Sequence, residues 1–212
     1  MEIHTLPVGP LEANCYLLVG REGCIAVDPG EEAGRIGAQV EKLGRRLAAV
    51  LLTHGHFDHI GAAKELRERY GCPIAIGEKD AELLGDPEKS LAGAGCAGCY
   101  LFEADRLLRD GESIEAAGLR LQALETPGHT LGSVSYLCEG RLFCGDVLFR
   151  GGVGRTDFYG GSFSVLGETL RALAALPEET LVYPGHGGST DIGQEKKSNP
   201  FLRMMMSDED FY

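Results

Sequence analysis

The chain has 212 residues, of which 43% are hydrophobic and 25% charged, proportions that are ordinary for a globular protein and exclude a disordered or fibrous one. This length predicts a single domain over residues 1–212. The formal net charge is −12 and no Lys/Arg-rich run interrupts the acidity, so nucleic acid is excluded as an expected partner, because an acidic surface repels phosphates.

The N-terminal half is predicted to contain strands and two helices. Apolar runs predict strands at residues 3–8, 15–19, 24–27, 47–52 and 73–76. Apolar residues spaced by three or four predict helices at residues 31–43 and 59–70, each followed by a terminating glycine, Gly44 and Gly71. Residues 81–98 show little periodicity, which predicts a short helix followed by a long loop.

The C-terminal half continues the alternation of strands and helices. Strands are expected at residues 119–124, 134–138, 142–144 and 181–183, and a helix at residues 163–176 that ends at Pro177. Three pairs predict turns between short strands, namely Glu22-Gly23, Asp110-Gly111 and Glu139-Gly140. Strands in both halves with helices between them predict a layered α/β protein, with two sheets inside and helices outside.

Compartment and cysteine chemistry follow from what the chain lacks. Residues 1–10 have no signal-peptide pattern and no apolar run is long enough to span a bilayer, so we expect a cytoplasmic protein without a membrane partner. In that reducing compartment all seven cysteines are expected to be thiols. Cys96 and Cys99 form a C-x-x-C pair in a small-residue loop, whose role the sequence leaves open.

Four potential metal ligands lie within six residues, directly after the strand predicted at 47–52. They are His54, His56, Asp58 and His59. If the strand continues, His54 and His56 share one side of it, because strand side chains alternate. Asp58 and His59 then lie at the start of the next helix and point back to the same space. Taken alone, Asp58 would be better explained as a helix N-cap.

Three further ligand-type residues, His129, Asp146 and His186, each follow another strand-like run. We expect these strand ends to converge at one rim of a sheet. Imidazole and carboxylate groups suit zinc, iron or manganese, with zinc as the first choice. Seven ligands are too many for one tetrahedral ion, but they fit two divalent ions that share one carboxylate and one hydroxide.

The segment Thr53-His54-Gly55-His56-Phe57-Asp58-His59 resembles the T-H-x-H-x-D-H signature of the metallo-β-lactamase superfamily. The other ligands follow in the order of that family, and the similarity extends over essentially the whole chain. It implies the αββα four-layer sandwich. It also implies that one ion binds His54, His56 and His129, that the second binds Asp58, His59 and His186, and that Asp146 bridges them.

Within that superfamily the chain is most similar to glyoxalase II (hydroxyacylglutathione hydrolase), through residues 145–149, 154–161 and 184–187 and the tail at 192–193 and 199–202. Only 26 residues follow His186, which implies a short form without the C-terminal helical domain of the full-length enzymes. Those enzymes also carry an aromatic residue where this chain has Asp157.

The resemblance implies thioester hydrolysis through a metal-bridging hydroxide, with S-lactoylglutathione or a related small-molecule acylthiol as substrate. Asp58 is expected to orient that hydroxide as well as to bind metal. Arg155 is expected to bind a substrate carboxylate, and Phe158 and Tyr159 to line the pocket. The alternatives are a surface ion pair for Arg155 and core positions for the two aromatic residues. Asp28 is expected either to orient a ligand histidine, as Thr53 is, or to form a turn.

Two alternative functions remain open at this point. Residues 154–158 also resemble the iron-dependent persulfide dioxygenases. The other alternative is a non-catalytic metal-binding or interaction module, against which all seven ligands are present. A β-lactamase is disfavoured because an export signal is lacking and an aspartate bridge is not its pattern. The sequence leaves the metal identity and the oligomeric state open.

Overall fold

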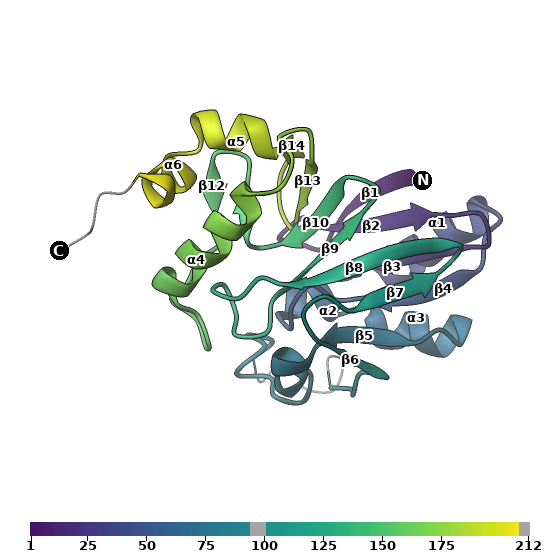
Figure 1. Ribbon diagram of the computed structural model, residues 1–212. Helices are drawn as coiled ribbons and strands as arrows, with labels where there is room; N and C mark the ends of the chain where they lie inside the picture. The colour runs from purple at the N-terminus through teal and green to yellow at the C-terminus, as the bar shows by residue number, and fades with distance from the viewer. Residues whose placement is uncertain (94–100, 208–212) are drawn as a thin grey trace.

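A computed structural model describes residues 1–93 and 101–207. In these ranges two six-stranded sheets lie between two groups of helices (Figure 1). The first sheet has the spatial order β1 (Glu2–Val8), β2 (Ala13–Val19), β3 (Cys24–Val27), β4 (Leu47–Leu51), β5 (Ile74–Gly77) and β6 (Arg106–Leu108). The second has the order β14 (Thr190–Asp191), β13 (Leu181–Pro184), β10 (Arg141–Gly145), β9 (Val134–Cys138), β8 (Leu119–Glu125) and β7 (Ser113–Ala116).

Helices cover the outer face of each sheet. Two of them, α1 (Ala33–Lys42) and α3 (Ala63–Tyr70), cover the first sheet, and α4 (Phe163–Ala174), α5 (Ile192–Ser198) and α6 (Pro200–Met206) gather over the second (Figure 1). A two-stranded hairpin of β11 (Leu148–Phe149) and β12 (Gly152–Val153) precedes α4. The predicted αββα architecture is confirmed.

Three apolar cores separate the four layers, and strand β2 contributes to two of them. Cys15 and Leu17 pack toward the helices of the first sheet, whereas Tyr16 and Leu18 pack between the sheets. Every residue of β2 is buried, because both faces of its sheet are covered. This explains why residues 15–19 of the strand are a mainly apolar run rather than an alternating one.

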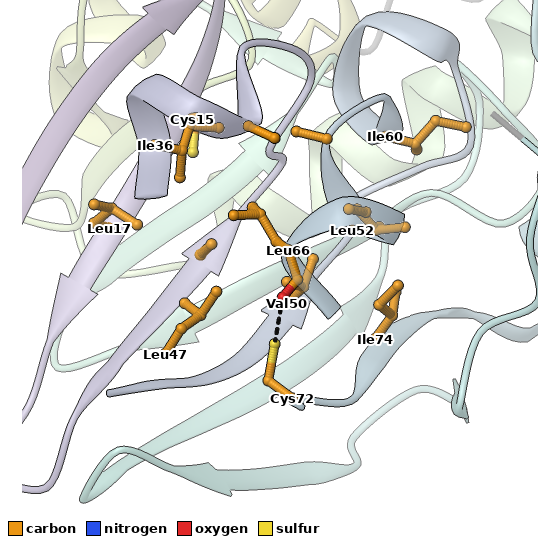
Figure 2. Close-up of a cluster of buried hydrophobic side chains, with 14 of the residues drawn as sticks. Cys15, Leu17, Ile36, Leu47, Val50, Leu52, Ile60, Leu66, Cys72 and Ile74 are labelled. Atoms are coloured by element: carbon orange, nitrogen blue, oxygen red, sulfur yellow. Dashed lines mark hydrogen bonds between the residues drawn. The ribbon is translucent and has the colours of Figure 1, made fainter. Parts of the chain in front are cut away.

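The core on the helix side of the first sheet shows how the predicted helical stripes are used. Ile36 of α1 and Leu66 of α3 lie among Leu17, Val50 and Ile74 of the strands, and all five are fully buried (Figure 2). Each such side chain contributes roughly 1.5–3 kcal/mol of burial free energy. The stripe predicted for residues 31–43 is therefore the face that joins α1 to the sheet.

Some elements differ from the sequence prediction. The helix expected over residues 59–70 is two helices, α2 (Phe57–Ile60) and α3, separated at Gly61-Ala62. The predicted short helix after residue 81 is a 3-10 helix, η1 (Glu78–Gly85). Among the described helices none is both long and apolar enough to cross a membrane. The five described cysteines are buried thiols, and Cys96 and Cys99 lie outside the described residues.

Candidate metal centre

The seven predicted ligand residues follow four strand ends drawn from both sheets, not from one sheet as expected. Strand β4 of the first sheet leads to the segment from His54 to His59, and β8, β10 and β13 of the second lead to His129, Asp146 and His186. The three strands of the second sheet run parallel to one another, since β9 is antiparallel to both β8 and β10. Their carboxyl ends therefore meet at one edge.

The first group of side chains consists of His54, His56 and His129, all buried. Their ligand nitrogens lie within 4.8 Å of one another, and His129 Nε2 is 2.9 Å from His56 Nδ1. The expected strand does not continue through this segment, because β4 ends at Leu51. A bend brings the rings of His54 and His56 together instead, with centroids 4.8 Å apart.

The second group consists of Asp58, His59 and His186, whose ligand atoms also lie within 4.8 Å of one another. His186 Nε2 is 3.2 Å and His59 Nε2 is 3.6 Å from Asp58 Oδ2. Asp58 and His59 lie in the first turn of α2, as predicted, and that turn directs both side chains toward His186.

Asp146 lies between the two groups. Its Oδ1 is 3.5 Å from His59 Nε2, and its Oδ2 is 3.7 Å from His129 Nε2 and 3.6 Å from His186 Nε2. Each carboxylate oxygen thus faces imidazole nitrogens of a ligand group. This is the position that a carboxylate shared by two cations requires.

Several buried polar atoms at this centre have no hydrogen-bond partner among the described residues. They are the Nε2 atoms of His54, His56 and His59 and the Oδ1 atom of Asp146. Burying a polar atom without a partner costs roughly 1–3 kcal/mol. His56 faces His129 through its other nitrogen, Nδ1, whereas imidazole nitrogens and carboxylate oxygens such as those of His54, His59 and Asp146 fit divalent transition metals.

The opposite ring nitrogens are fixed by other groups. The Nδ1–H of His59 donates to Asp28 Oδ2 at 3.0 Å and that of His129 to the Arg155 carbonyl at 2.7 Å. His54 Nδ1 lies 3.0 Å from Thr53 Oγ1, and His186 Nδ1 lies 3.1 Å from the Leu11 carbonyl. With Nδ1 engaged as a donor, Nε2 is the nitrogen of these rings that is left to bind a metal, which displaces any proton it carries.

Two histidines of the first group, His54 and His56, are held neutral. Burial lowers the pKa of His54 well below its usual value, and the neighbouring imidazoles lower it further. Burial and the nearby His129 lower the pKa of His56 to about 3. Neutral imidazoles are the form that binds a metal.

The second group has the opposite charge balance. Burial acts to lower the pKa of His59, but the carboxylates of Asp146, Asp58 and Asp28 outweigh it and raise that pKa to about 10. Burial likewise opposes ionisation of Asp58, yet His59 and His186 lower its pKa to about 2. Asp58 is therefore held as a carboxylate, the form that binds a cation.

Of the predicted substrate residues, Phe158 contacts the centre, whereas the side chains of Arg155 and Tyr159 bind other residues. The ring of Phe158 is half-buried with its centroid 5.8 Å from that of His56. Arg155 is exposed, forms a bidentate ion pair with Asp157 at 2.7 and 2.9 Å, and lies 4.1 Å above the Phe158 ring. Tyr159 is exposed and donates to Glu82 Oε1 at 3.0 Å.

Asn14 and Tyr16 hold the loop that carries His186, a role that sequence reasoning did not assign. The amide of Asn14 donates to the carbonyls of Pro184 and Gly187 at 3.1 and 2.9 Å, and the Tyr16 hydroxyl donates to the Pro184 carbonyl at 2.6 Å. The available signal was a buried-type strand that carries two polar side chains, which must find partners when both faces are covered.

Comparison with known proteins agrees with this geometry. The family model described as "Metallo-beta-lactamase superfamily" matches residues 8–186. The chain is 40% identical over 208 residues to the probable metallo-hydrolase YqgX of Bacillus subtilis and 39% identical over 208 residues to hydroxyacylglutathione hydrolase GloC of Haemophilus influenzae. Both alignments cover 95% of this chain and 98% of the relative.

Three solved structures are similar over nearly the whole chain. BLEG-1, described as a B3 metallo-beta-lactamase, matches with a TM-score of 0.90 at 36% identity, covering 95% of this chain and 99% of that one. TTHA1623, crystallised in a di-iron-bound form, matches with a TM-score of 0.81 at 36% identity, covering 93% and 99%. ETHE1 from Myxococcus xanthus matches with a TM-score of 0.79 at 34% identity, covering 98% and 91%.

With two sheets between helices and a histidine–aspartate centre at their shared edge, the chain belongs to the metallo-beta-lactamase superfamily. Within that superfamily it is a metallo-hydrolase, as its relatives indicate.

Proposed function

We propose that the protein hydrolyses thioesters of small acylthiols such as S-lactoylglutathione. The observation that carries the proposal is the set of unpartnered buried ligand atoms on His54, His56, His59 and Asp146. The similarity to a hydroxyacylglutathione hydrolase over 95% of the chain supports a thioester as the scissile group. A thiolate is a good leaving group, so the centre needs no strong general acid.

The two ligand groups define two metal positions in this proposal. His54, His56 and His129 hold the first ion, and Asp58, His59 and His186 hold the second, with Asp146 shared between them. We assign zinc to both positions, with iron and manganese as alternatives that accept the same ligands. The di-iron form of TTHA1623 supports iron as the first of these alternatives.

Two divalent ions at these positions would supply Lewis acidity and lower the pKa of a water that they share. The residues of the chain do the rest. Asp58 is held as a carboxylate, so it accepts a hydrogen bond from the attacking water and orients it. Thr53 and Asp28 keep the ligand imidazoles in the required tautomers.

On the substrate side, Phe158 offers an apolar wall beside His56. We assign Tyr159, which is exposed and donates to Glu82, to the rim of the pocket. The Arg155 guanidinium is already paired with Asp157, so a substrate carboxylate must compete with that ion pair. Because both partners are exposed, the pair is worth little, and a carboxylate ligand can displace Asp157 at small cost.

The test is a substrate panel with protein whose metal content has been measured. Acylthiols are assayed without oxygen, glutathione persulfide is assayed by oxygen uptake, and a chromogenic β-lactam covers the activity named for BLEG-1. We expect about two metal ions per chain and thioester cleavage under anaerobic conditions, since a Lewis acid needs no redox change. Oxygen uptake without thioester cleavage would replace the proposal by a persulfide dioxygenase. Metal binding with no turnover of any substrate would leave a metal-binding module.

A further inference from the structure

Asp80 is a fully buried carboxylate outside the seven ligand residues, in the turn of η1. Its Oδ2 accepts hydrogen bonds from the Gly55 N–H at 3.0 Å and from the Thr130 hydroxyl at 2.7 Å, and its Oδ1 accepts from the Gly132 N–H at 2.7 Å. All three donors belong to the two loops that carry the three-histidine group. Asp80 therefore connects a segment of the first sheet's edge to one of the second.

The placement of these donors in the chain is the reason that Asp80 matters for the centre. Gly55 lies between His54 and His56, and Thr130 directly follows His129. A shift of the Gly55 N–H or of Thr130, which donates through its hydroxyl, moves the backbone next to a ligand residue. The two loops are 73 residues apart in sequence, measured from His56 to His129, and Asp80 joins them through one rigid carboxylate.

The packing of the two glycines is an independent sign that η1 sets the spacing of the loops. A Cβ atom on Gly55 would lie 2.5 Å from Leu83 Cβ, and one on Gly132 would lie 2.3 Å from the Asp80 backbone nitrogen. Both loop backbones thus lie directly against η1, with no room for a side chain. The 3-10 helix η1 therefore fixes the distance between the two loops.

A carboxylate suits this position better than its isosteric amide. An isolated buried charge is expensive, but hydrogen bonds to a charged acceptor are roughly twice as strong as neutral ones, and Asp80 accepts three. Asparagine has only one acceptor oxygen in its side chain. In either orientation its NH₂ group, a donor, would face another donor: the Gly132 N–H on one side, or the Gly55 N–H and the Thr130 hydroxyl on the other.

We propose that Asp80 is a positioning residue that fixes the loop of His54 and His56 against the loop of His129, and so sets the affinity of the three-histidine metal position. The inference rests on the metal assignment of the proposed function, but not on the identity of the substrate. Among the described residues, the side-chain hydrogen bonds of Asp80 reach neither Asp146 nor His186. The effect is therefore confined to one of the two metal positions.

The experiment compares metal binding by Asp80→Asn with that of the full-length wild-type protein. Metal-free protein is titrated with Co²⁺, whose visible absorption bands report the coordination of each position, and a chromogenic chelator provides the competing affinity. We expect the Asp80→Asn variant to bind the ion of the three-histidine position at least about tenfold more weakly, the range found for residues that orient metal ligands. Binding at the second position stays at the wild-type affinity.

Glu195→Gln is the matched control for general destabilisation. Glu195 is also a fully buried carboxylate with three donors, from the Gly151 N–H, the Thr190 hydroxyl and the Asn199 amide. We expect this variant to lower the unfolding temperature while it binds both ions with wild-type affinity. An Asp80→Asn protein that loses stability to the same degree and still binds both Co²⁺ ions normally would overturn the proposal.

Thr130→Val keeps the test decisive if Asp80→Asn does not fold. This variant removes one of the three donors and leaves the charge of Asp80 in place. It is expected to release the ion of the three-histidine position faster in a chelator chase, and a wild-type release rate would contradict the proposal. Thioester rates are measured separately: two Co²⁺ ions bound without hydrolysis of any acylthiol would overturn the thioesterase function and leave the role of Asp80 intact.

Discussion

Asp28 combines an unusual backbone conformation with a cluster of buried hydrogen bonds. Its φ is +49°, in the left-handed region where aspartate and asparagine are several-fold enriched. Its Oδ1 accepts from the Thr53 N–H at 2.7 Å, and its Oδ2 accepts from the Thr53 hydroxyl at 2.6 Å and from His59 at 3.0 Å. The turn role and the partner role considered from the sequence are therefore carried by one residue.

Asp28→Asn separates these two roles, because asparagine also tolerates positive φ. We expect the backbone turn to remain. The Nδ1–H of His59 loses its carboxylate acceptor, so metal affinity at the second position is expected to fall about 10–100-fold. Metal content after dialysis and the unfolding temperature are the measurements. Loss of the fold together with both metals would show instead that Asp28 acts mainly through the turn.

Gly185 is a position where any side chain collides with the centre. A Cβ atom there would lie 2.1 Å from Asp146 Oδ1 and 2.7 Å from His59 Cε1. Gly185→Ala must therefore displace Asp146 or His59, and we expect a loss of at least one metal ion with a drop in kcat/KM of about a hundredfold, as displacements near 1 Å produce. Gly188→Ala in the same loop is the control, since only Arg150 atoms approach to 3.9 Å there. Equal rates for the two variants would refute the crowding argument.

At the scale of elements, continuous apolar runs made the central strands predictable, and tertiary contacts decided the rest. Strands β11, β12 and β14 have two residues each, too few for a periodic pattern. The predicted helix over residues 59–70 breaks because the Ala62 N–H bonds to the Pro29 carbonyl at 2.9 Å and leaves the helical ladder. No local pattern encodes a hydrogen bond to a residue 33 positions earlier.

In the candidate site, too, local sequence patterns predicted one part and tertiary contacts decided the other. The spacing of His54, His56, Asp58 and His59 within one segment identified a cluster of ligand-type residues without any structure. Asp80 gave no such sign, because a single acidic residue in a short turn is normally solvent-exposed. The three hydrogen-bond donors to Asp80 lie 25, 50 and 52 positions away in the sequence, and only the packed sheets bring them together.

Helix α6 was not predicted, although its start carries a recognisable pattern of Asn199 followed by Pro200. Asn199 caps the helix by accepting from the Phe201 and Leu202 N–H groups at 3.0 and 3.2 Å. Its amide also donates to the Gly152 carbonyl at 3.0 Å in the β11–β12 hairpin. This side chain therefore joins the C-terminal helices to the segment that follows Asp146.

Asn199→Ala is expected to destabilise the protein by about 1–3 kcal/mol, since both a cap and buried hydrogen bonds are lost. Asp191→Ala is the comparison, because Asp191 caps α5 only through the exposed hydrogen bond from Gln194 N–H at 2.7 Å. That variant should cost no more than about 1 kcal/mol. Urea unfolding of both proteins measures the difference, and equal costs would mean that the buried contacts of Asn199 contribute nothing.

At the scale of the whole molecule, the metal centre links the two halves of the sandwich. The segment that follows strand β4 of the first sheet supplies four of the seven ligand residues, and segments that follow three strands of the second sheet supply the other three. Without metal, the unpartnered buried atoms of His54, His56, His59 and Asp146 oppose the packing of the sheet edges. Bound ions reverse this effect, so metal binding and folding are coupled.

Removal of the metal should therefore lower the stability of the entire fold. An ion present at about a hundred times its Kd stabilises the native state by about 2.7 kcal/mol, and two independent ions by about twice that. For a domain of this size each kcal/mol shifts the unfolding temperature by about 2–4 °C, so we expect chelation to lower it by about 10–20 °C. Thermal unfolding with chelator, and again after zinc is restored, measures the change. The shift should be smaller in Asp146→Ala, which loses the shared ligand, and an unfolding temperature that is insensitive to chelator in the wild-type protein would contradict the coupling.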